Sequence, residues 1–188
     1  QTKLRPHAGR HRQPFRFMVG WSRPLTDHGA DGRRLDLTEM FELLSQLAPL
    51  RLGPVTPDTD RCVEILKKEL PFNLLEFQSD REFNGWVVPK NWYVRKAEIR
   101  REGKLIYDGL STPIGVIGYS KSFTGRLALK DLLPHLFYHH SLPDASVYHC
   151  DLFYKQWRDE WGFSVPRFLR DSLSPGVYDV NLQTEFAD

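Results

Sequence analysis

Two segments in the first half of the chain repeat apolar residues at the spacing of an amphipathic helix. Asp36 takes the N-cap position in "LDLTEMFELLSQLAPL", and Thr56 takes it in "TPDTDRCVEILKKELPF". We therefore predict helices over residues 36–48 and 57–70. Their apolar faces consist of Leu37, Met40, Leu43, Leu44 and Leu47 in the first, and of Cys62, Ile65, Leu66 and Leu70 in the second.

After Pro71 the hydrophobic period changes from 3.6 to two, which predicts strands. The strand segments are "FNLLEFQ", "GWVVP", "YVRKAEIRREGKLIYDG", "IGVIGYS" and "GVYDVNLQTEF", with a hairpin turn at Gly103. Short helices are predicted in "LALKDLLPHLFYHH" and "PRFLRDSL". The fold class predicted from this pattern is α+β, with a mainly antiparallel, β-rich module after the helices. We expect the last strand, which has no later partner in this sequence, to form an exposed sheet edge.

Residues 1–35 show no sustained hydrophobic period, and their basic residues outnumber their acidic ones. Two interpretations of this basic arm stay open. It could contact an acidic surface or nucleic acid, or it could be a solvated or partner-packed extension, which is the commoner role for such a charged segment.

Composition and charge narrow the class of protein. The chain has 188 residues, of which 40% are hydrophobic, so it can bury one good core or two small ones. A formal net charge of +2 is close to balance and argues against a general binder of nucleic acid or acidic membranes. No run approaches the roughly 20 apolar residues of a membrane span. Cys62 and Cys150 lie far apart, which favours a reducing, cytoplasmic setting.

Histidines are the first candidates for metal binding or general base chemistry. His135 and His139 would share one face of a helical turn, and His149, Cys150 or Asp151 could complete a zinc site. The spacing matches no established metal motif, so a structural role is the better interpretation. No nucleophile or phosphate-loop motif is present either, and we assign no catalytic residue and no metal ligand.

Large aromatic residues offer a second kind of candidate site. Such side chains either fill a core or wall a pocket, and the core is the commoner destination. We predict that four of them could line a pocket: Trp86, Tyr154, Trp157 and Trp161.

Several of these segments, taken in order, resemble a family of bacterial and archaeal aminopeptidase-like proteins related to the two-zinc aminopeptidases. The resemblance covers about residues 36–186. It rests on three motifs: a Trp-x-Val-Pro-x-x-Trp strand, a Tyr-Ser strand, and a Tyr-Lys segment that ends in Trp-Gly-Phe. The matching residues are Gly85, Trp86, Val88, Pro89 and Trp92; Tyr119 and Ser120; and Tyr154, Lys155, Trp161, Gly162 and Phe163.

The resemblance implies a zinc-peptidase-like α/β core that receives a β-rich inserted module. We then expect a basic arm at 1–35, the helical start of the core at 36–76, the inserted module at 77–165, and a return to the core at 166–188. The aromatic residues around Trp161 would pack where the module rejoins the core, and could also shape a wall of the substrate cleft.

The family's metal ligands follow in a long C-terminal part that begins with a Cys-His-Pro-like motif, and no residue of this sequence matches them. The resemblance therefore implies that this chain is the N-terminal portion of a zinc-dependent aminopeptidase-like hydrolase, and that it is inactive alone. Zinc is expected only in the C-terminal part. The implied partners are the C-terminal half of the same protein and a peptide or aminoacyl substrate, with a homo-oligomer also allowed. We expect no nucleic-acid or membrane partner.

Three alternatives remain. The first is a non-catalytic, aromatic-rich β-module that binds a small ligand or peptide. The second is an interaction protein that uses its basic arm. The third and least favoured is a stand-alone metal enzyme built on His135, His139 and His149.

Overall fold

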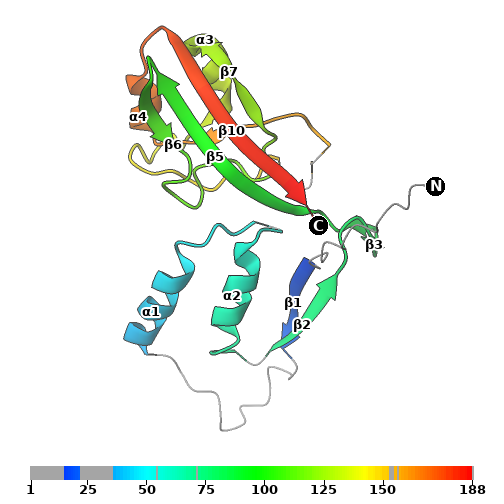
Figure 1. Cartoon of the computed structure of the whole chain (residues 1–188). Helices are drawn as coiled ribbons and strands as arrows, with labels where there is room; N and C mark the ends of the chain where they lie inside the picture. The colour runs from blue at the N-terminus through cyan, green and yellow to red at the C-terminus, as the bar shows by residue number, and fades with distance from the viewer. Residues whose placement is uncertain are drawn as a thin grey trace, which may run out of the picture.

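The computed structural model describes residues 15–21, 36–53, 55–70, 72–152, 155 and 157–187, the first range as backbone only. Helices and mostly antiparallel sheets together make an α+β fold, as the sequence predicted. Figure 1 shows a β-rich half at one end and a smaller half with the two long helices at the other. No helix among the described residues is long and apolar enough to cross a membrane.

A four-stranded antiparallel sheet with the order β6-β5-β10-β7 forms the larger half. Its strands are β5 (Asn91–Arg101), β6 (Lys104–Asp108), β7 (Phe123–Ala128) and β10 (Val177–Ala187). Strand β10 pairs with β5 on one side and with β7 on the other, so it lies inside the sheet. The expectation that this last strand forms an exposed edge is therefore wrong, because its partners all precede it in the chain.

Alternation along the strands separates the two faces of the sheet. In β10, Tyr178, Val180 and Leu182 are buried, while Asp179 and Asn181 between them are partly exposed. The inward side chains join buried residues of β5 and of the loops beneath in one core. Its buried members are Trp92, Ala97, Ile99, Val116, Ile117, Tyr119, Leu132, Leu136, Leu152, Trp161, Phe163, Val165, Tyr178, Val180 and Leu182.

Short elements cover the inner face of the sheet. They are α3 (Leu129–Leu132), the 3₁₀ turn η1 (Leu133–His135), β8 (Leu136–Phe137), β9 (Phe163–Ser164) and α4 (Arg167–Ser172). Strands β8 and β9 pair in parallel. The two short helices were predicted from the sequence.

The segment "IGVIGYS", predicted as a strand, is instead a series of turns below the sheet. Its strand-like pairing among the described residues is limited to one bridge, between Val116 and Phe163. Tyr119 has a positive φ of 66°, which a strand does not allow. Apolar side chains are buried here by a compact loop, and the hydrophobic pattern alone does not distinguish such a loop from a strand.

The smaller half contains α1 (Leu37–Leu47), α2 (Asp58–Leu66), and an antiparallel pair formed by β1 (Phe15–Trp21) and β2 (Phe72–Phe77). Both helices were predicted, and Asp36 forms the expected capping box with Glu39. Strand β1 was not predicted, since it lies within the segment interpreted as an unstructured arm. The rest of that arm lies outside the described residues.

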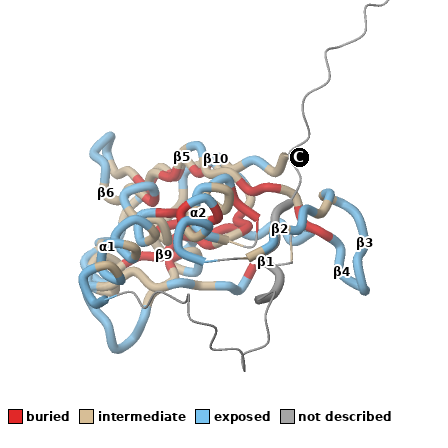
Figure 2. The backbone as a smooth tube through the Cα atoms, turned by 90° about the horizontal axis from the view of Figure 1, so that it is seen from below, coloured by how far each residue is buried: buried red, intermediate tan, exposed pale blue. Residues whose placement is uncertain are grey.

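A small hairpin of β3 (Glu82–Phe83) and β4 (Trp86–Val87) connects the two halves. Figure 2 shows it projecting from the body of the molecule as an exposed loop, whereas the buried backbone concentrates around β5, β10 and α2.

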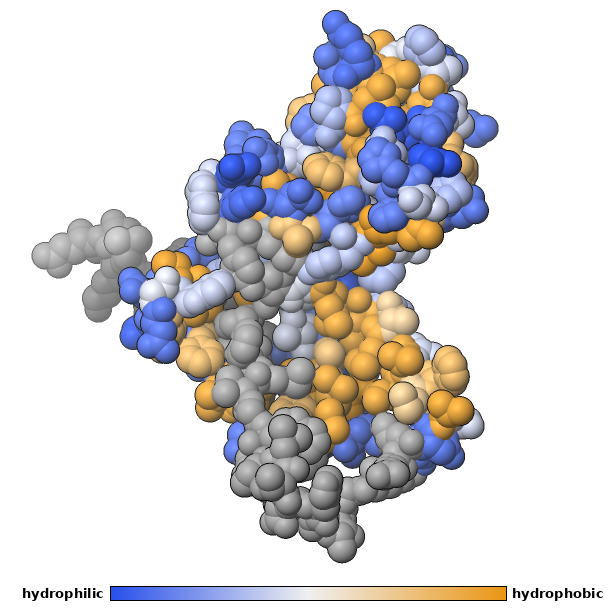
Figure 3. All heavy atoms as spheres, turned by 180° about the vertical axis from the view of Figure 1, so that it is seen from behind, coloured by the Kyte–Doolittle hydropathy of each residue, from blue (hydrophilic) through white to orange (hydrophobic). Residues whose placement is uncertain are grey.

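Helix α1 differs from α2 in how it uses its apolar residues. Val63 and Ile65 of α2 are buried, but no residue of α1 is. Four large apolar side chains of α1 are exposed: Leu37 (73%), Met40 (46%), Phe41 (69%) and Leu44 (55%). We call these four residues the α1 stripe. Figure 3 shows apolar surface gathered over this half of the molecule.

Candidate functional site

The candidate pocket-lining aromatic residues lie in different environments. Trp86, on the projecting β3–β4 hairpin, is 61% exposed, and Trp157 is 74% exposed. Trp161 is buried in the core, and Tyr154 lies outside the described residues. Trp86, Trp157 and Trp161 do not line any of the three cavities found among the described residues. Their role in a pocket stays a prediction.

Trp161 is held in a stack of rings. Its indole lies between the ring of Phe123, at 4.4 Å, and the imidazole of His135, at 3.8 Å, both nearly parallel to it. His135 Nδ1 also lies 2.9 Å from the carbonyl oxygen of Trp161. These contacts fix the Trp-Gly-Phe segment against β7, which gives Trp161 a packing role.

The candidate histidines do not converge on one point. His135 stacks on Trp161, whereas His139 accepts a hydrogen bond from the backbone N–H of Ser141 at its Nδ1. His149 lies beside Phe137, with its Nδ1 3.9 Å from Asp151. Within the described ranges, no three His, Cys, Asp or Glu side chains are grouped closely enough to hold a metal ion.

Ser120, from the Tyr-Ser motif, is completely buried. Its hydroxyl donates to the carbonyl oxygen of Ile117 at 2.6 Å and accepts from the N–H of Gly162 at 3.1 Å. The indole N–H of Trp92 donates to the carbonyl oxygen of Ser120 at 3.0 Å. Hydrogen bonds thus join Trp92, Ser120 and Gly162, which come from three separate sequence motifs. Ser120 therefore has a structural role and is not a nucleophile.

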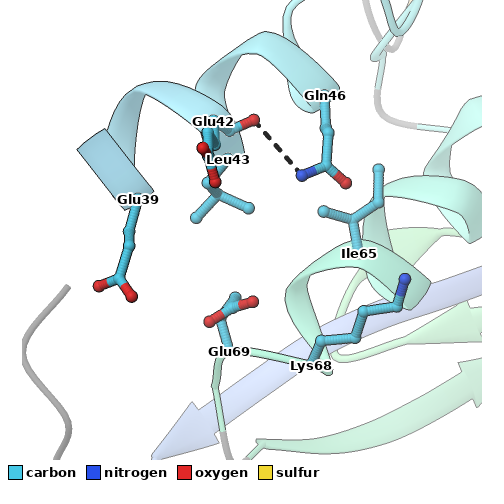
Figure 4. Close-up of a pocket in the computed structure, with 7 residues that line it drawn as sticks. All are labelled: Glu39, Glu42, Leu43, Gln46, Ile65, Lys68 and Glu69. Atoms are coloured by element: carbon cyan, nitrogen blue, oxygen red, sulfur yellow. Dashed lines mark hydrogen bonds between the residues drawn. The ribbon is translucent and has the colours of Figure 1, made fainter. Parts of the chain in front are cut away.

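A cleft of about 290 Å³ separates α1 from α2 (Figure 4). Glu39, Leu43 and Glu69 point into the space between the helices. The Glu39 carboxylate is used in the cap of α1, where it accepts the Asp36 N–H at 2.9 Å. The Gln46 amide donates to the carbonyl oxygen of Glu42 at 3.4 Å. These interactions belong to the helix itself and supply no catalytic arrangement.

The junction between the two halves contains polar groups that the sequence did not reveal. The N–H of Trp92 donates to the carbonyl oxygen of Val55 at 3.0 Å. Arg51, in the loop after α1, donates from Nη2 to the carbonyl oxygen of Thr112 at 3.0 Å. A small cavity lies here, and both Arg51 and His149 line it. The sequence could not predict that Arg51 lies beside this cavity, because a single arginine after a helix belongs to no motif.

Burial lowers the pKa values of Arg51 and His149. Desolvation lowers the pKa of Arg51, although the negative charge of Asp58 opposes the change. Desolvation also lowers the pKa of His149, with Asp151 again acting in the opposite direction. The junction therefore places an arginine and a histidine, both partly buried and both with a lowered pKa, beside one cavity.

The family model described as "Domain of unknown function (DUF2172)" matches residues 91–185, from the start of β5 to near the end of β10. The chain belongs to the DUF2172 family. The matched DUF2172 range contains the whole four-stranded sheet, apart from the last residues of β10, and most of the core beneath it.

Two relatives from Clostridium acetobutylicum extend the match beyond the DUF2172 range. One, named as a candidate polysaccharide biosynthesis protein with an aminopeptidase-like domain, is 25% identical over 153 residues. A crystal structure of a candidate peptidase is 24% identical with a TM-score of 0.70, which shows the same fold. Both matches cover 80% of this chain but only 34% and 35% of the relatives, so the chain spans about a third of their length.

Proposed function

We propose that this chain is the N-terminal and inserted-domain portion of a zinc-dependent aminopeptidase-like hydrolase. The names of the two relatives support a peptidase-like role. The described residues offer no group of metal ligands, so they do not fit a zinc site and we derive no catalytic step through zinc. In this proposal the zinc and the catalytic groups belong to a further part of the protein, and the present chain supports and covers that part.

The α1 stripe is the observation that carries the proposal. A surface helix normally buries its apolar face, and each large apolar side chain gains about 1.5–3 kcal/mol when it is buried. Leu37, Met40, Phe41 and Leu44 leave that gain unused in this chain. The relatives continue for roughly twice the length of the matched region, which is enough chain for a domain that covers this stripe.

The proposal is tested on the protein as it occurs in its source cells, purified through a tag at its N-terminus. Intact mass and zinc content are measured first, followed by hydrolysis of an aminoacyl p-nitroanilide with and without a chelator. We expect a mass well above 22.0 kDa, about one or two zinc ions per protein, and chelator-sensitive hydrolysis. Residues 1–188 alone serve as the inactive control. A source protein of 22.0 kDa without zinc would contradict the proposal.

A further inference from the structure

Only part of the hydrogen-bonding capacity of the Arg51 guanidinium group is satisfied. Its Nη2 donates to two neutral acceptors, the carbonyl oxygens of Thr112 and Gly109, at 3.0 and 3.4 Å. Its Nη1 is buried and has no hydrogen-bond partner among the described residues. A buried donor without a partner is costly, and the cost is larger for a charged group. An acceptor that reached Nη1 would remove this cost.

The negative charges near Arg51 do not outweigh the desolvation that lowers the pKa of its guanidinium. Asp58 makes the largest favourable contribution, yet its Oδ2 already accepts the backbone N–H of Arg51 at 2.8 Å. Asp108 contributes less. Burial opposes the charged form, but arginine stays protonated at all ordinary pH values. A negative group that reaches Nη1 would thus gain both a hydrogen bond and charge compensation.

The cavity beside Arg51 has the walls and the size for one such group. Its volume is about 20 Å³, which accommodates a water-sized polar group. Buried Trp92 and Val116 and half-buried Ile114 supply apolar walls. Tyr148, 55% exposed, connects the lining with solvent. His149 lines the same cavity, and its Nε2 is buried without a hydrogen-bond partner among the described residues.

We propose that this junction cavity binds the carboxylate of a ligand with an apolar substituent, and that Arg51 Nη1 donates a hydrogen bond to one carboxylate oxygen. A single guanidinium matches the single charge of a carboxylate, and a planar two-oxygen group suits a narrow cavity better than a tetrahedral phosphate. The cavity holds only the carboxylate group, and the substituent contacts the exposed Leu52 and Tyr148 at its opening. This inference does not depend on the peptidase-like proposal.

The first test follows thermal unfolding of the chain in sodium benzoate, sodium acetate and sodium chloride at equal ionic strength. We expect benzoate to raise the unfolding midpoint saturably, by about 2–4 °C at roughly five times its Kd, acetate to act more weakly, and chloride not to act in this way. Equal effects of benzoate and chloride would overturn the proposal.

Two variants locate the effect. Arg51→Met removes the donor and should abolish the benzoate shift, whereas the matched control Arg101→Met should retain it. Arg101 is also a partly buried arginine that donates to a backbone carbonyl, that of Pro175, and it is not among the residues that line the cavity. Retention of the shift in Arg51→Met, or its loss in Arg101→Met, would count against the site.

Because Arg51 also holds the turn at Thr112, its variant could unfold, so a measurement on the unchanged chain is added. Benzoate titration should shift the methyl NMR signals of Ile114 and Val116, which line the cavity. Methyl signals that stay fixed while benzoate stabilises the chain would place binding elsewhere and overturn the assignment.

The source of the carboxylate is resolved with a short peptide. Acetyl-Ala-Phe is compared as the free acid and as the C-terminal amide. Binding of the acid but not of the amide assigns the cavity to peptide carboxyl termini, and binding of benzoate alone assigns it to small free acids; both support carboxylate recognition. Equal binding of the acid and the amide would refute it.

Discussion

The fold partly buries the imidazole of His149. Its side chain is 18% exposed, and burial is the main cause of its lowered pKa, with a smaller contribution in the same direction from nearby His139. Asp151, at 3.9 Å, partly opposes both. His149 therefore binds a proton less readily in the folded chain than in the unfolded chain.

This depressed pKa predicts the sign of one contribution to pH-dependent stability. Below the ordinary value of 6.5 the unfolded chain binds the proton first, so stability falls as the pH decreases from 7 toward the lower, folded-state pKa. We expect the free energy of unfolding to decrease less over pH 7 to 5 in His149→Gln than in the wild-type chain.

Urea unfolding at several pH values measures this difference, and His140→Gln is the control because His140 is exposed. The prediction is wrong if His149→Gln loses as much stability as the wild-type chain between pH 7 and 5 while His140→Gln loses less. His140 would then cause the pH dependence.

At the scale of elements, the two tight hairpins use the same turn geometry with different residues. The β3–β4 turn has Asn84 and Gly85 at φ values of 50° and 81°, and the β5–β6 turn has Glu102 and Gly103 at 51° and 77°. Positive φ at both central positions is the type I′ pattern, for which Asn-Gly is strongly preferred. Glu102 thus occupies a conformation that suits asparagine better.

We predict that Glu102→Asn stabilises the β5–β6 hairpin by up to about 1 kcal/mol, because asparagine tolerates positive φ more readily. The ion pair that is lost, between Glu102 and Arg101, is 3.8 Å long and its glutamate is 86% exposed, so its removal costs little. The measurement is the midpoint of urea unfolding. Asn84→Glu, the reverse change in the other turn, should lower that midpoint, and a stabilised Asn84→Glu would contradict the argument.

Elements with a regular period could be predicted from the sequence, while those defined by long-range contacts could not. Both helices, β2 and the β5–β6 hairpin follow directly from apolar spacing and turn residues. Strand β7 was missed because Gly125 and Arg126 interrupt its pattern, and its pairing with β10 is set by residues about 50 to 60 positions away. Strand β1 was missed because its short apolar run is surrounded by basic residues.

The candidate site could not be predicted from the sequence either, because it depends on contacts between distant segments. Arg51, Trp92 and His149 come together only because the helical half contacts the sheet, and no motif links them in the sequence. The aromatic residues drew attention by their size, which does not distinguish the buried Trp161 from the exposed Trp157.

At the scale of the whole molecule, the exposure of the α1 stripe predicts that a substitution in it changes stability little in residues 1–188 and more in a longer protein that covers the stripe. We expect Phe41→Gln to change the stability of residues 1–188 by no more than about 0.5 kcal/mol, since Phe41 is 69% exposed. Val63→Gln in α2 is the matched control and should cost at least about 2 kcal/mol, because Val63 is 3% exposed.

Urea unfolding of the chain compares the two variants, and the larger source protein described above is then tested with Phe41→Gln. There we expect destabilisation comparable to that of Val63→Gln. Equal costs for the two variants in residues 1–188 would show that the stripe is already packed within this chain.

The central position of β10 has a consequence for the order in which the protein can be made. Translation produces β5, β6 and β7 first, but β5 and β7 each pair with β10, so a sheet that contains both cannot form before residues 177–187 have been made. During synthesis, the unpaired sides of these strands are exposed, and such strands are prone to join other chains. The sheet can therefore close only in one late step, after translation has passed its middle strand.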